Sequence, residues 1–337
     1  MAGIIFSESA GLGDSIFGKS QAPIKLLIEK KAEACEAVST LPLLFSMEKS
    51  NSYAEKFTSM TAMDDFIPVG ENGAHPATGT QEGYSKTLEN VTWKNSFSVS
   101  REMVDDSKAI DFKQKTNSFV AGYYRTREKF GAALFGEALK GSTSMIFGGH
   151  TFDTTSADAS ALFSKTHPGK VSGKNQSNKF SDAFSADALA AVECAMQDFR
   201  GDNNELLDLA PDTIVIPNLY ALKRDVFAAI GADKDPATAN NGFNYHFGRW
   251  NVVVNPYLNQ FITAGTSPWI LIDSRYNQEN YGAILLDRVQ LEVTSSVDRN
   301  TNANIWDGYA RFTGGFNDWR FAAAGGITGG TTLISQS

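Results

Sequence analysis

The sequence contains few of the side chains from which metal centres, disulfide frameworks and many catalytic sites are built. Its 337 residues include only two cysteines and four histidines. Cys35 and Cys194 lie far apart in the chain and show no CxxC spacing, so neither a disulfide framework nor a zinc site is indicated. We expect both cysteines to be small buried hydrophobic residues in a reducing compartment.

Long hydrophobic runs are also missing. Nowhere do about 18 apolar residues follow one another, which predicts that no helix spans a membrane. The first twelve residues carry no positive charge before the short apolar run 4–6, so the sequence predicts no secretory signal. We therefore expect a protein that is cytosolic or is assembled in a cytosol.

Basic residues are outnumbered by acidic ones. The chain has 30 Lys plus Arg against 38 Asp plus Glu, a formal charge of -8. Proteins that wrap nucleic acid neutralise phosphates with clustered Lys and Arg, so this balance argues against such a role. At 42% hydrophobic and 20% charged residues the composition is typical of a globular protein, and the length leaves room for about two domains.

One motif matches a catalytic pattern letter for letter. Residues 13–20 read GDSIFGKS, the P-loop pattern, and Asp273 follows an apolar run as a magnesium-binding aspartate does. A P-loop needs a buried strand directly before it and a helix that begins at its lysine. Polar residues 7–11 interrupt that order, and Pro23 would remove an amide donor from the first turns of the helix. The sequence therefore disfavours a P-loop NTPase, which stays as an alternative.

The other candidates for catalysis fit structural roles better. There is no HExxH or GxSxG motif, and no histidine has a partner at metal-ligand spacing. We expect the four histidines in loops: His75, His150, His167 and His246. Acidic neighbours at 64–65 would point to opposite faces of a strand, and those at 105–106 suit a helix start. The sequence predicts no catalytic, cofactor-binding or metal-ligating residue, and no cofactor.

The N-terminal third predicts an arm and a long hairpin. Residues 1–22 have no sustained period and indicate an extended arm, after which Pro23 begins a short amphipathic helix. From Tyr53 to Val99, strand-like stretches flank a tip at 68–76 that is dense in turn formers. The returning side, 91–99, alternates with the period of a strand.

A two-stranded hairpin of this length must pack against other parts of the protein or against another copy. A two-stranded ribbon is marginal in water, and its edges present unpaired backbone groups. Either the rest of the chain or another copy must pack on it, and the polar tip favours another copy.

A long helix is predicted directly after the hairpin. Residues 108–140 lack proline, follow a run of N-cap residues and end at Gly141. Large side chains share one face of this helix: Phe112, Thr116, Phe119, Tyr123, Phe130 and Leu134. At 1.5 Å per residue it would be about 50 Å long, which indicates a spine. We expect Gly122, Gly131 and Gly136 to mark bends or close packing.

The remainder predicts a surface loop followed by a separate α/β region. Residues 141–184 are mostly polar and indicate the loop. Ser185 should cap a helix that ends at Gly201, and Pro217 should open another that Gly231 closes. Strands are expected at 213–216, 250–254 and 269–273, and as antiparallel strands within 283–323 around a turn at 298–302.

This order of elements resembles the tailed-bacteriophage major capsid proteins of the Hong Kong 97-type fold, with the Mu-like major head subunits the most similar. The similarity runs from about Leu43 to Ala323. The phrases that carry it are VGENG at 69–73, FSVSREMVDDS at 97–107, ALFSKTH at 161–167 and DTIVIP at 212–217.

The resemblance implies an α+β fold with five parts. They are an N-terminal arm at 1–52, an E-loop hairpin at 53–100, a P-domain with the spine helix at 101–180, an A-domain at 181–280 and a return to the P-domain at 281–337. Some relatives cross-link an E-loop lysine to a neighbour. Lys86 is expected to be a loop lysine, but no specific motif supports that reaction here.

The resemblance also implies a function. The chain would be a non-enzymatic major capsid protein that self-assembles through pentamers and hexamers into an icosahedral phage head. The shell would enclose double-stranded DNA without sequence-specific contact, and would be located in the virion after assembly in the host bacterial cytoplasm. Further partners could be portal, scaffold and decoration proteins, with no membrane. An encapsulin-type cellular compartment is the alternative with the same fold.

Overall fold

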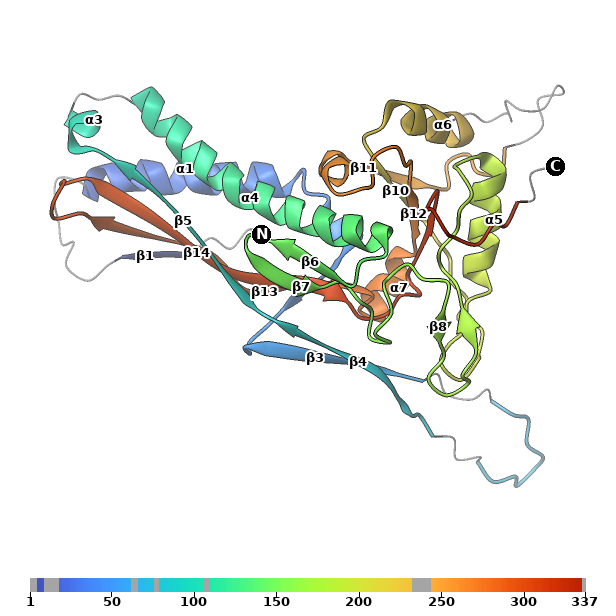
Figure 1. Cartoon of the computed structure of the whole chain (residues 1–337). Coiled ribbons are helices and arrows are strands. Elements are labelled where there is room, and N and C mark those ends of the chain that lie inside the picture. The colour runs from blue at the N-terminus through green and yellow to red at the C-terminus, as the bar shows by residue number, and fades with distance from the viewer. Residues whose placement is uncertain are drawn as a thin grey trace.

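Two sheets lie at opposite ends of an elongated molecule, and a hairpin projects from it (Figure 1). The computed structural model describes residues 5–8, 18–61, 66–75, 79–105, 109–231 and 244–334. Only the backbone is described at 5–8, 18–24, 104–105 and 109–112.

The first sheet is built around two long strands, β13 (Ala283–Val297) and β14 (Asn304–Phe316). They pair antiparallel across the polar turn, so this prediction is confirmed. On the far side of β14 lies β5 (Val91–Val99). The outer edge of β13 pairs in parallel with two short strands, β1 (Ile5–Glu8) and β2 (Ser46–Lys49).

The spine helix is confirmed. It is α4 (Ala109–Lys140), and it ends at Gly141, whose φ of +77° suits a residue without a Cβ. Val120, Phe130 and Leu134 on its inner face are fully buried. Short α3 (Arg101–Asp105) precedes it in the chain.

The helix of the N-terminal arm begins earlier than expected. It is α1 (Gly18–Glu36), so Pro23 is its sixth residue and not its first. At that position the missing amide removes one hydrogen bond within the helix, a loss that contacts with α4 can offset. The prediction that the helix begins at Pro23 was therefore wrong.

The hairpin is shorter than predicted. It pairs β3 (Ala54–Met60) with β4 (Glu82–Glu89), and the chain then crosses to the first sheet as β5. The prediction of one ribbon reaching Val99 is wrong because β5 carries Trp93, which stacks on Phe312 with ring centroids 4.8 Å apart. That aromatic contact is unavailable to a free ribbon.

The segment 141–184 is more ordered than a surface loop. It contains the hairpin of β6 (Ser144–Phe147) and β7 (His150–Asp153), and the short pair β8 (His167–Pro168) and β9 (Asn175–Gln176). Leu162, Phe163 and Phe180 lie in the main hydrophobic core.

The second sheet has the strand order β11-β10-β12-β15. Its strands are β10 (Thr213–Pro217), β11 (Asn251–Asn255), β12 (Trp269–Ile272) and β15 (Ala322–Gly325). The other helices are α2 (Leu41–Leu44), α5 (Ala186–Gln197), α6 (Tyr220–Ile230), η1 (Pro256–Gln260) and α7 (Ser274–Glu279). Ser185 caps α5 as predicted, accepting a hydrogen bond from the Ala188 amide at 3.0 Å.

Both cysteines are free thiols, but their predicted burial is wrong. Cys35 on α1 is half-buried and Cys194 on α5 is exposed. Cys194 follows the buried Glu193 and lies on the solvent side of a helix whose inner face is already filled by Val192 and Met196.

Candidate functional site

The described residues give no support to the P-loop alternative. Residues 13–17 lie outside them, and β1 is an edge strand of its sheet. Asp273, the expected magnesium ligand, is fully buried and caps α7. Its two oxygens accept hydrogen bonds from the amides of Tyr276 at 2.8 Å and Ala210 at 2.7 Å. The carboxylate therefore has a structural role.

His167 lies in the core and not in a loop. Its Nδ1 is 2.7 Å from Asp158 and its Nε2 is 3.2 Å from the side-chain oxygen of Asn178. The ring stacks on Trp319 at 4.2 Å. Burial acts to raise the pKa of Asp158, but hydrogen bonds from His167 and Ser156 lower it overall. The cluster holds the segment 156–178 against the core.

His246 is also buried. Its Nδ1 accepts a hydrogen bond from the Trp250 indole at 3.2 Å, and its Nε2 is 3.2 Å from the Ala186 carbonyl. Burial lowers the pKa of His246. His75 and His150 are exposed. In the part of the chain that the structure describes, no three His, Cys, Asp or Glu side chains are placed to hold a metal ion.

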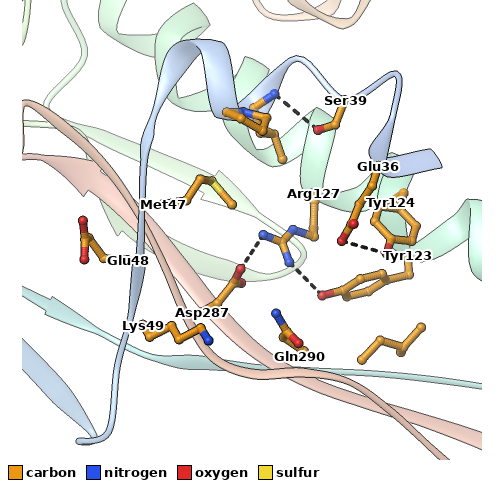
Figure 2. Close-up of a pocket in the computed structure, with 13 residues that line it drawn as sticks. Glu36, Ser39, Met47, Glu48, Lys49, Tyr123, Tyr124, Arg127, Asp287 and Gln290 are labelled. Atoms are coloured by element: carbon orange, nitrogen blue, oxygen red, sulfur yellow. Dashed lines mark hydrogen bonds and ion pairs between the residues drawn. The ribbon is translucent and has the colours of Figure 1, made fainter. Parts of the chain in front are cut away.

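A pocket of about 300 Å³ lies between the end of α1, the middle of α4 and β13 (Figure 2). At its centre the Arg127 guanidinium donates to Asp287 at 2.7 Å and to the Tyr123 hydroxyl at 2.9 Å. Burial raises the pKa of Tyr123, which keeps the phenol neutral. Both partners of Arg127 come from the fold itself, so the group ties the spine helix to β13.

Two lysines fasten the paired strands of the hairpin, which we call its root, to the body. Lys86, on β4, is buried and contacts Asp153 at 2.5 Å and both the carbonyl and the hydroxyl of Thr155, at 2.9 and 2.8 Å. Lys86 thus belongs to the hairpin as expected, but it lies buried on a strand. Lys170 donates to the Gly83 carbonyl at 2.5 Å. The root of the hairpin is therefore fixed on its own chain.

The far end of the hairpin is bare. Phe66 is fully exposed, and Ile67 and Val69 are at least half exposed. In Figure 1 this end extends beyond the body of the molecule, past β8. Large apolar side chains that are left in water on a projecting element are typical of a contact surface.

A groove of about 210 Å³ lies between α4 and β5. Its apolar lining includes Trp93, Phe119 and Phe312, and its two charged lining residues, Lys94 and Arg125, are both basic and exposed. Sequence reasoning missed this groove because α4, β5 and β14 meet there only after folding. The mixture of glycine and aromatic residues in β14 was the available signal.

The described part of the chain holds no helix that is both long and apolar enough to cross a bilayer.

Comparison with known proteins gives a consistent result. A family model described as "Phage capsid protein" matches residues 84–325. No curated protein sequence matches the chain.

Several solved structures are similar in fold. The capsid of an empty GTA particle, computed with C5 symmetry, is 14% identical with a TM-score of 0.50, over 86% of this chain and 89% of that one. A structure of Mycobacterium phage Patience is 12% identical with a TM-score of 0.50, over 99% of this chain and 95% of that one. The capsid of Ralstonia phage GP4 is 11% identical with a TM-score of 0.51, over 86% of this chain and 89% of that one.

Proposed function

The chain belongs to the phage capsid protein family, and on this premise we propose that its copies join in pentamers and hexamers to form the icosahedral head of a tailed bacteriophage. It is a major capsid protein with the α+β Hong Kong 97-type fold, and its place is the virion capsid. The proposal gives it a structural and not an enzymatic role.

The proposed assembly rests on one observation: the root of the hairpin is fixed to the body, while its far end exposes large apolar side chains to solvent. Lys86 and Lys170 hold the root on the body, while Phe66 and its apolar neighbours meet no part of the described chain that buries them. A second copy would remove this surface from water. Contacts between unlike surfaces of identical subunits generate rings when the rotation between them closes.

The proposed cargo is double-stranded DNA. The formal charge of -8 supports a container that does not bind its contents tightly, because strong binding to phosphates needs clustered basic residues. Contact with DNA would be independent of base sequence. Assembly in the host bacterial cytoplasm, and contacts with portal, scaffold and decoration proteins, belong to the same proposal.

We also propose the domain division given by the sequence, with the E-loop confined to the hairpin of β3 and β4. The arm would be 1–52, the P-domain 101–180 with 281–337, and the A-domain 181–280. The two sheets support most of this division, since β13 and β14 share one sheet while β10, β11 and β12 lie in the other. The exception is β15, which belongs to the segment 281–337 but pairs with β12 in the second sheet.

Purification of particles after expression tests the proposal. We expect closed shells in negative-stain images, and nuclease-protected double-stranded DNA in particles from infected cells. Shells that protect protein cargo and no DNA would favour the encapsulin-type compartment. Lys19→Ala should leave assembly unchanged, whereas nucleotide binding that disappears in Lys19→Ala would revive the NTPase alternative.

A further inference from the structure

We propose that the Asn72–Gly73 bond at the hairpin end is a site of spontaneous modification, in which the side-chain nitrogen of Asn72 is lost and an aspartate or isoaspartate forms. The modification itself is independent of the proposed function. Its consequence, that subunits left unassembled gradually lose the ability to assemble, rests on that function.

The turn at the hairpin end selects this pair of residues. The Gly73 amide donates to the Gly70 carbonyl at 2.9 Å, which closes a four-residue turn. Asn72, at the third position, has a φ of +64°, as a type II turn requires, and glycine and asparagine are the residues that suit this position. At position 73 a Cβ would lie 2.7 Å from the Cβ of Val69, so the turn also requires glycine there.

An asparagine followed by glycine carries the reacting groups of a ring closure. The main-chain nitrogen of Gly73 attacks the side-chain carbonyl carbon of Asn72, and a five-membered succinimide forms. The bond from that carbon to the side-chain nitrogen breaks, and the nitrogen leaves as ammonia with the proton from Gly73. Water then opens the ring at either carbonyl and gives aspartate or isoaspartate. The net change is the gain of one water and the loss of one ammonia.

The hairpin end is open to this reaction. It projects from the body (Figure 1), and residues 70–75 are all exposed to water. Gly73 has no Cβ that would hinder rotation of the chain toward the Asn72 side chain. The hydrogen bond to Gly70 must open first, and bonds in exposed turns open locally at little cost in free energy. Asparagine is also among the thermolabile residue types.

A second left-handed asparagine in the chain provides a matched comparison. Asn302 is exposed and has a φ of +52°, so its backbone resembles that of Asn72. It is followed by Ala303, whose Cβ hinders the approach of the main-chain nitrogen. The other Asn-Gly pair of the sequence, at 241–242, lies outside the described residues.

The product would alter the apolar surface of the hairpin end. Conversion replaces a neutral amide with a carboxylate, next to the acidic Glu71. Isoaspartate also inserts a methylene group into the main chain, which changes the geometry of the turn. Because Val69 packs beside Gly73, this change displaces an exposed apolar side chain that the proposed assembly buries.

Peptide mapping of the purified full chain measures the modification. The protein is held below its assembly concentration at mildly alkaline pH, which promotes removal of the Gly73 amide proton, and mass spectrometry follows aspartate and isoaspartate at each position. Conversion at Asn72 should be at least tenfold faster than at Asn302, because only glycine leaves the chain free to rotate. No conversion at Asn72, or equal rates at the two sites, would overturn the assignment.

Assembly after incubation tests the consequence. Wild-type subunits should lose assembly competence in proportion to the converted fraction. Asn72→Gly, which suits the left-handed position and cannot react, should retain it under the same treatment. Circular dichroism checks that both stay folded. Converted wild type that assembles as well as fresh protein would overturn the consequence. If fresh wild type never assembles, the proposed function fails, whereas the mapping result still decides the modification.

Discussion

The Nζ of Lys86 lies 2.5 Å from the carboxylate of Asp153, and this pair joins the hairpin to the β6–β7 hairpin on the body. Lys86 is buried while Asp153 remains more than half exposed. The hydrogen bonds from Lys86 and Thr155 outweigh burial and lower the pKa of Asp153, so the carboxylate stays charged at neutral pH. The hairpin thus leaves the body at a fixed point.

Lys86→Met should loosen the hairpin root. The variant keeps the length of the side chain but loses three hydrogen bonds, and a hydrogen bond to a charged group contributes about 1.5–3 kcal/mol. Because Asp153 can be rehydrated, we expect a loss near the lower end of that range. Amide hydrogen exchange over 82–89 should accelerate, whereas Lys56→Met on the exposed side of β3 should leave it unchanged. Equal exchange in both variants would contradict the anchoring role.

Two glycines of the spine helix should respond oppositely to alanine. Gly122→Ala should stabilise the unassembled subunit by up to about 1 kcal/mol, since the new methyl group meets nothing and the helix gains propensity. Gly136→Ala should destabilise it by about 1–3 kcal/mol, because its Cβ would collide with Phe261. Urea unfolding of both variants measures the difference, and changes of the same sign would be inconsistent with the packing of α4.

Arg320 is expected to contribute strongly to the stability of the fold. Its guanidinium donates to Asp202 at 2.8 Å and to Asp318 at 3.2 Å, both buried, and to the Arg200 carbonyl at 2.9 Å. Arg320→Met would leave two buried carboxylates without their cation, a change that costs about 3–5 kcal/mol.

The matched control for Arg320 is Arg224→Met on α6, whose partner Asp225 is also exposed. Such a surface pair contributes about 0–1 kcal/mol. Thermal unfolding of the two variants side by side gives the comparison, and similar melting temperatures would refute the buried role of Arg320.

His246 should make the subunit less stable as the pH falls. Burial lowers its pKa in the folded state below the ordinary 6.5, so the unfolded state binds the proton more tightly. Stability is then full above pH 6.5 and declines below it. His246→Gln should lose stability throughout but flatten this dependence between pH 7.5 and 5.5. An unchanged slope in denaturant titrations would count against this role for His246.

Local signals in the sequence were sufficient to predict the elements whose ends are marked by a capping residue or a turn. The spine helix ends at Gly141 and α5 begins at Ser185, because a cap or a left-handed residue acts within a few positions of the chain. The turn at 298–302 likewise defined β13 and β14.

Contacts between residues that are far apart in the chain could not be predicted in the same way. The strand 91–99 was recognised, but its partner depended on Phe312 and Trp306, more than 200 residues away. The burial of His167 depended on Asp158, Asn178 and Trp319, which only the fold brings together. The groove between α4 and β5 arises in the same manner, from segments that are far apart in the chain.

A cryo-electron microscopy map of the assembled particle tests the account most directly. We predict a closed icosahedral shell in which the exposed side chains of Phe66, Ile67 and Val69 are buried against a neighbouring copy. A protein that stays a 36.5 kDa monomer under assembly conditions, or a map in which the hairpin folds back on its own chain, would contradict it.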